Sequence, residues 1–127
     1  MKYINTINSQ FSDYKYNGGS SACFIKCPAF SKILNIQIKN SMLNIIYQSN
    51  EYVNIYENNG EFKTFTFIVI SGLIQNNTTI PDSFEYFDTI KTLEDDRVEY
   101  YHIFIQETKS LKEIRDNKID ELMNSEF

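Results

Sequence analysis

The stretch that decides the fold is residues 33–39, Ile-Leu-Asn-Ile-Gln-Ile-Lys, in which apolar and polar side chains alternate. Successive side chains of a β-strand point to opposite faces of a sheet. Leu34, Ile36 and Ile38 therefore share one face, and the polar residues share the other. The segment predicts a strand that is buried on one side and exposed to water on the other.

Three more alternating segments follow at short intervals, over residues 42–48, 51–57 and 62–70. The first two gaps consist of Asn and Ser, and the third contains Asn58-Asn59-Gly60, the clearest turn signal in the chain. Near the end of the last segment both faces are apolar, which predicts burial on both sides there. Together the four segments predict a β-meander of adjacent strands.

A β-hairpin is predicted next, with arms over residues 84–92 and 98–106 after a polar loop over residues 76–83. Asp88 interrupts the apolar face of the first arm, and a short helix over residues 83–92 is the alternative. The expected apolar face of the second arm consists of Val98, Tyr100, His102 and Phe104.

The chain changes to a helical period after the hairpin. Apolar residues recur there as Leu111, Ile114, Ile119, Leu122 and Met123. Ser110 and Glu113 have the spacing of a capping box, in which each side chain bonds the backbone N–H of the other residue. We expect a helix that begins at Leu111 and lays its apolar stripe on the sheet.

The first 32 residues have weaker signals, namely a candidate edge strand over residues 3–7, a loop over 17–21 and a short apolar piece over 22–25. The predicted fold class is α+β, with an antiparallel β-meander plus a β-hairpin forming one sheet and a C-terminal amphipathic helix packed on it. A chain of 127 residues and 15.0 kDa has the usual size of one domain, residues 1–127.

Composition and charge narrow the classes of protein. No apolar run reaches the roughly 18 to 20 residues that span a bilayer, and the first ten residues lack the apolar core of a secretory signal. We therefore expect a cytoplasmic protein that does not bind membranes. Residues 1–80 carry a net charge of +2 and residues 81–127 carry −7. No cluster of Lys and Arg is present, so nucleic-acid binding is not expected.

Neither a metal site nor a cofactor is expected. Cys23, Cys27 and His102 supply three of the four ligands that a structural zinc ion needs. The consecutive acids Glu94-Asp95-Asp96 lack the ordered spacing of a calcium-binding loop and are typical of a solvated turn.

One alternative function is enzymatic and uses Gln10, Cys23 and His102. Their order resembles that of papain-like thiol hydrolases, in which an oxyanion-stabilising Gln precedes the nucleophilic Cys and a His base follows far downstream. The resemblance implies a thiol nucleophile at Cys23 and a base at His102. Pro28 stands where the central helix of such an enzyme should run, so the main hypothesis is not an enzyme.

The main hypothesis is a small acidic binding module that neutralises or chaperones another protein with a basic surface. In size, acidity and layout the chain is similar to bacterial immunity proteins that block toxin domains, to phage-encoded inhibitors and to secretion chaperones. The predicted partner-binding residues are the aromatic Tyr52, Tyr56 and Tyr101 and the acidic Asp82, Glu85, Glu94, Asp95, Asp96 and Glu99. A homo-oligomeric structural or secretion component, such as a homodimer that pairs exposed strand edges, is the remaining alternative.

Overall fold

The structure, a computed structural model, describes residues 1–11, 14–16, 20–40, 42–50 and 62–125. Its elements are, in chain order, strands β1 (Tyr3–Gln10), β2 (Tyr14–Tyr16), β3 (Ser20–Pro28), β4 (Lys32–Lys39), β5 (Met42–Ser49), β6 (Phe62–Ser71), β7 (Glu85–Glu94) and β8 (Arg97–Thr108), and helix α1 (Leu111–Ser125). The α+β class is confirmed.

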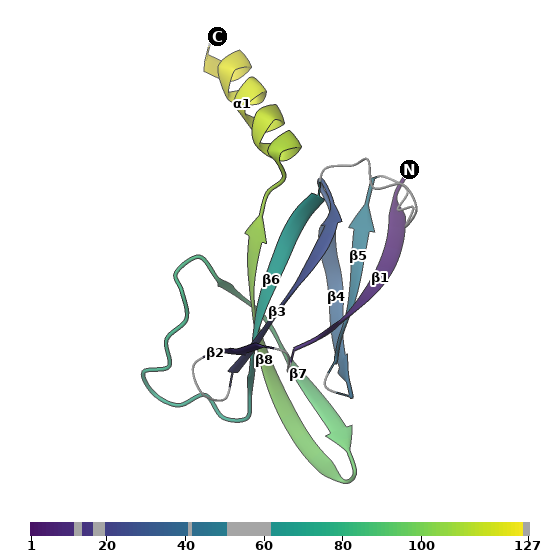
Figure 1. The fold of residues 1–127 in the computed structure, drawn as a ribbon, viewed down its shortest axis with the longest axis vertical. Helices are drawn as coiled ribbons and strands as arrows, with labels where there is room; N and C mark the ends of the chain where they lie inside the picture. Colours follow the sequence, from purple (N-terminus) through teal and green to yellow (C-terminus); the bar gives the residue numbers. More distant parts are fainter. Residues whose placement is uncertain (12–13, 17–19, 41, 51–61, 126–127) are drawn as a thin grey trace.

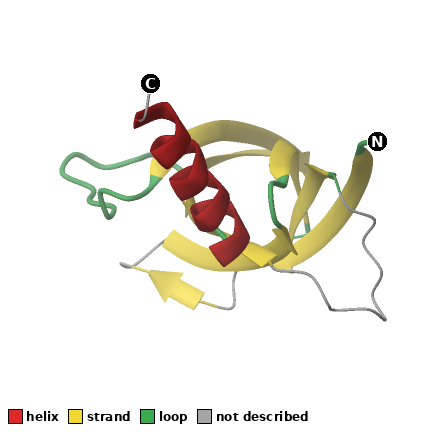
Figure 2. Ribbon diagram, turned by 90° about the horizontal axis from the view of Figure 1, so that it is seen from above, coloured by secondary structure: helices red, strands yellow, loops and turns green. Residues whose placement is uncertain are grey.

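The strands form two antiparallel sheets, so the prediction of one sheet is wrong. A three-stranded sheet has the order β1-β5-β4, and a five-stranded sheet has the order β2-β3-β6-β8-β7. β1 contacts β3, and β4 contacts β7, so the two sheets close around one interior. Figure 2 shows the strands curving around this interior, while Figure 1 shows α1 and the β7–β8 hairpin at opposite ends of the molecule.

The predicted meander is also wrong, although its described strands are present. β4 and β5 form a hairpin in one sheet, whereas β6 lies between β3 and β8 in the other. The predicted strand over residues 51–57 lies outside the described residues. β6 is buried on both faces near its end, as predicted, with Val69 on one face and Ile68 and Ile70 on the other. β6 has a neighbouring strand on each edge, β3 and β8, whereas the last strand of a meander has one.

The β7–β8 hairpin is confirmed, and the alternative helix over residues 83–92 is excluded because β7 is extended. The expected apolar face of β8 is nevertheless the outward one. Ile103 is fully buried, and Tyr101 and Ile105 pack on the core beside it, so His102 points to the opposite face. A β-bulge between Tyr86 and Asp88 explains the interruption in β7, because an extra residue shifts the alternation of side chains.

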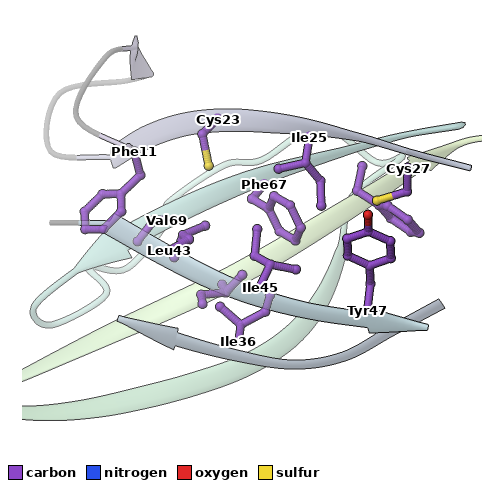
Figure 3. Close-up of a cluster of buried hydrophobic side chains, with 12 residues drawn as sticks. Phe11, Cys23, Ile25, Cys27, Ile36, Leu43, Ile45, Tyr47, Phe67 and Val69 are labelled. Carbon is purple, nitrogen blue, oxygen red and sulfur yellow. The ribbon is translucent and has the colours of Figure 1, made fainter. Parts of the chain in front are cut away.

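The core lies between the two sheets, where odd-numbered residues of β3, β6 and β8 meet β4 and β5 (Figure 3). Phe67 and Ile45 are completely buried at its centre. At one end the hydroxyl of Tyr47 points toward the sulfur of Cys27 (Figure 3). One contiguous cluster of apolar side chains thus holds both sheets together.

Helix α1 begins at Leu111 as predicted, but it does not lie on a sheet. Leu111, Ile119 and Leu122 are more than half exposed, and the helix extends away from the strands (Figure 1). The Oγ atom of Ser110 accepts the Glu113 N–H at 3.2 Å, which confirms that half of the capping box. In the described residues no helix is long and apolar enough to span a membrane.

The first turn of α1 is anchored by a buried ion pair rather than by its apolar stripe. Lys63 is 4% exposed, and its Nζ lies 3.2 Å from Glu113 Oε2 and 2.5 Å from Glu107 Oε1. The same ammonium donates to the carbonyl of Ser31 at 3.0 Å. Glu113 Oε1 accepts the N–H of Phe30 at 2.7 Å, at a residue whose φ of 63° is unusual for a bulky side chain. The Glu113 carboxylate thus contacts both the Lys63 ammonium and the backbone N–H of Phe30.

Candidate functional site

The negative charge of the protein is concentrated in one short segment. Residues 82–99 contain seven of the 17 acidic side chains and two of the 12 basic ones, so the other 109 residues carry ten of each and are balanced. The whole net charge of −5 therefore belongs to this segment, which forms β7, its turn and the start of β8. A field concentrated in this way attracts basic surfaces from solution.

The segment forms a projecting hairpin, which we call the acidic arm (residues 82–99). It extends beyond the other strands at the bottom of Figure 1. Asp95 and Asp96 have φ values of 51° and 59°, as a two-residue type I′ turn requires, and Asp tolerates this conformation. The turn fixes the register in which Leu93 lies opposite Val98. Since Leu93 is 72% exposed, the arm presents apolar as well as acidic side chains to solvent.

The outer face of the arm continues as a row of aromatic side chains. Tyr100 follows Val98 on this face and is nearly half exposed. Tyr86 and Phe104 pack edge to face, with ring centroids 5.7 Å apart. Exposed Tyr side chains beside acids are typical of protein-binding surfaces, because they bury a large area with little loss of entropy.

A groove lies at the base of the arm, where β6 leaves β8. β6 pairs with β8 as far as Ser71, and Gly72 then turns away with a φ of 83°. The Gly72 N–H still donates to the carbonyl of Tyr100 at 2.9 Å. The groove has a volume of about 650 Å³. Its lining consists of Phe11, Ser71, Gly72, Leu73, Val98, Glu99, Tyr100 and Tyr101.

Tyr101, one of the predicted binding residues, is partly buried: it lines this groove and packs against the core. Its ring packs edge to face on Phe11, with centroids 5.7 Å apart. Its hydroxyl donates to Glu99 Oε2 at 2.5 Å. The groove therefore combines two aromatic rings with a carboxylate whose position is fixed by a phenol, a set that suits a cationic side chain.

His102 connects the arm to the end of β6 through hydrogen bonds on the outer face. Its Nε2 lies 3.0 Å from the carbonyl oxygen of Gly72, which only accepts, so Nε2 carries the proton. Nδ1 lies 3.0 Å from Thr89 Oγ1, within hydrogen-bond distance. Thr89 Oγ1 also shares a hydrogen bond of 2.7 Å with the Tyr86 hydroxyl. Both ring nitrogens are thus engaged within the chain and hold the base of the arm.

The remaining predicted binding residues fall into two groups. Asp82, Glu85, Asp95 and Asp96 are exposed on or beside the arm, and Glu94 is the last residue of β7. Tyr52 and Tyr56 lie outside the described residues. Sequence reasoning missed Phe11, Gly72 and Leu73 in the groove, because they come from segments far apart in the chain; the glycine after β6 was the one local signal.

The residues of the thiol-hydrolase alternative are not brought together. Cys23 is buried on the core face of β3, whereas His102 faces the other side of the same sheet. Gln10 is exposed at the end of β1 in the other sheet. The thiol and the imidazole therefore lack the hydrogen bond that a nucleophile and its base require.

Cys27 provides a test of how the core protects its thiols. Burial raises the pKa of the Cys27 thiol to about 12, and Lys63 partly opposes this rise. Because the thiolate is the reactive form, we expect Cys27 and the buried Cys23 to react with a chromogenic disulfide reagent at pH 8 only after unfolding in urea. The unfolded thiol has a pKa near 9.0 and loses its proton first. Stability should therefore fall as the pH rises from about 9 to 12. Rapid labelling of either thiol in the folded protein would contradict this expectation.

Comparison of the chain with protein-family models, with curated proteins and with solved structures gives no significant match.

Proposed function

We propose that the protein is a non-enzymatic binding module that engages a basic surface of another protein through the acidic arm, and so neutralises or chaperones that partner. The observation that supports this proposal is the concentration of the whole net charge in one projecting hairpin. The charge speeds encounter and selects a basic partner, whereas the exposed Leu93, Val98 and Tyr100 supply the area that holds it.

The test is capture of partners from the native host lysate at low and high salt, with the bound protein identified by mass. The arm variant replaces Glu94→Gln, Asp95→Asn and Asp96→Asn. Asn keeps the positive φ of the turn, so this variant removes three charges without disturbing the hairpin. We expect one stoichiometric basic protein with the wild type, lost as salt rises, and about tenfold less of it with the arm variant.

A matched control removes the same charge elsewhere. Asp116→Asn, Asp120→Asn and Glu121→Gln change exposed residues of α1, at the opposite end of the molecule (Figure 1). This variant should retain the partner at the wild-type level. Equal losses with both variants, or no stoichiometric partner with the wild type, would contradict the proposal.

A further inference from the structure

Beside the groove, the edge of β8 that faces β6 has no described neighbouring strand at its first residues. β6 pairs with β8 only from Tyr101 onward, while β7 covers the other edge from Arg97. The carbonyl of Tyr100 accepts from Gly72 on the β6 side. Because backbone groups two residues apart point to the same side of a strand, the N–H and C=O of Val98 also point there. No described strand pairs with Val98 on that side.

The groove has the shape that an added strand needs. Its lining includes side chains on both faces of β8, with Glu99 and Tyr101 on the inner face and Val98 and Tyr100 on the outer face. Leu73, which is 94% exposed, stands beyond the point where β6 turns away. An extended chain placed there would continue the line of β6 and meet side chains on both of its faces.

The charges and rings around this edge select the occupant. A side chain of the added strand that points inward meets the Glu99 carboxylate and the rings of Phe11 and Tyr101. A guanidinium or ammonium group satisfies both, by an ion pair and by a cation–π contact. The outward side chains meet Val98 and Tyr100, which suit β-branched residues. A second copy of the chain fits less well, since it would bring two acidic arms together.

We propose that an extended, Arg- or Lys-bearing segment of the partner adds to the five-stranded sheet at Val98, with its basic side chain beside Glu99. This inference rests on the proposed function and specifies how the partner is held. Main-chain hydrogen bonds to Val98 supply affinity, and the alternating pockets supply the preference for basic residues on one face.

The test uses an acetylated and amidated seven-residue peptide of alternating Val and Arg, titrated into the full chain and followed by NMR. The key variant is Val98→Pro, which removes the N–H at the open edge. It spares the β7 bonds, because the backbone groups of Val98 point away from β7, and proline is tolerated on strand edges. We expect Val98→Pro to weaken peptide binding at least about tenfold. The matched variant Val98→Thr keeps the N–H and the β-branch and should bind like the wild type.

A second pair of measurements checks the charge. Glu99→Gln should weaken binding of the Arg peptide but not of the same peptide with Thr in place of Arg. Unchanged binding of the Arg peptide to Val98→Pro, or resonance shifts confined to residues outside the groove, would overturn the inference. A wild-type dimer in sedimentation that Val98→Pro dissociates would also overturn it, since the occupant would then be a second copy.

The two proposals fail in different ways. If capture of the native partner depends on the acidic arm but not on Val98→Pro, strand addition is wrong and the binding function stands. If Val98→Pro abolishes peptide binding while the arm variant captures the native partner normally, the peptide site at Val98 stands and the proposed role of the charges at Glu94, Asp95 and Asp96 is wrong.

Discussion

Replacing Lys63 by alanine is expected to lower the free energy of unfolding by about 3–5 kcal/mol. The ammonium is buried and lies between the carboxylates of Glu107 and Glu113. Without it, Glu113 keeps a negative charge at a site that is 4% exposed, and the carbonyl of Ser31 loses its side-chain donor. A buried charge that loses its partner costs far more than an exposed ion pair contributes.

Urea denaturation followed by circular dichroism measures this effect. Lys26→Ala is the matched control, because Lys26 is exposed on the neighbouring strand β3, in register with Thr64 beside Lys63. It should change the free energy of unfolding by less than about 0.5 kcal/mol. The triple variant Lys63→Met, Glu107→Leu and Glu113→Leu should recover much of the loss, since it removes every charge of the cluster. Equal stability of the two lysine variants would show that the cluster is solvated.

Replacing Phe67 by alanine is also expected to lower the free energy of unfolding by about 3–5 kcal/mol, here through the loss of core packing. Phe67 is completely buried, and it packs in the cluster that joins both sheets (Figure 3). Removal of the ring loses its transfer free energy and leaves a cavity in the core. Since domains of this size have about 5–15 kcal/mol of stability, this loss is a large fraction of the total.

Thermal unfolding monitored by tyrosine fluorescence checks the Phe67 prediction. Phe24→Ala is its control, because Phe24 is 51% exposed on the opposite face of β3. We expect a midpoint near that of the wild type for Phe24→Ala. For Phe67→Ala we expect a midpoint lower by about 10–20 °C, at about 4 °C per kcal/mol. Similar midpoints for the two variants would mean that the two sheets are not held by this core.

The positions of the strands and of the helix follow from local sequence patterns, whereas the pairing of the strands depends on residues far apart in the chain. Alternation located β4, β5, β6 and the β7–β8 hairpin, and the Ser110 spacing located the start of α1. Partition into two sheets depends on pairings such as β1 with β5, which join residues as far apart as Asn5 and Ser49. No local period encodes such pairings.

In the candidate site, too, some features are visible in the local sequence and others only in the strand pairing. The acidic arm is visible as a block of charge, but its inner and outer faces are not, because apolar side chains occur on both faces of β8. The bulge after Tyr86 shifts the phase of β7, and only the pairing with β8 reveals it. The groove is assembled from the end of β1, the end of β6 and the start of β8, so no single segment contains its pattern.

Helix α1 has an energetic consequence that follows from its exposure. In its first turn Glu113 complements the positive end of the helix macrodipole and Lys112 opposes it, and no basic residue in the last turn complements the negative end. A helix of 15 residues is marginal in water without packing on one face. The amides of α1 should therefore exchange with solvent through local opening, while those of β6 exchange only when the two sheets come apart. The molecule thus consists of a cooperative pair of sheets and a terminal helix that opens independently of them.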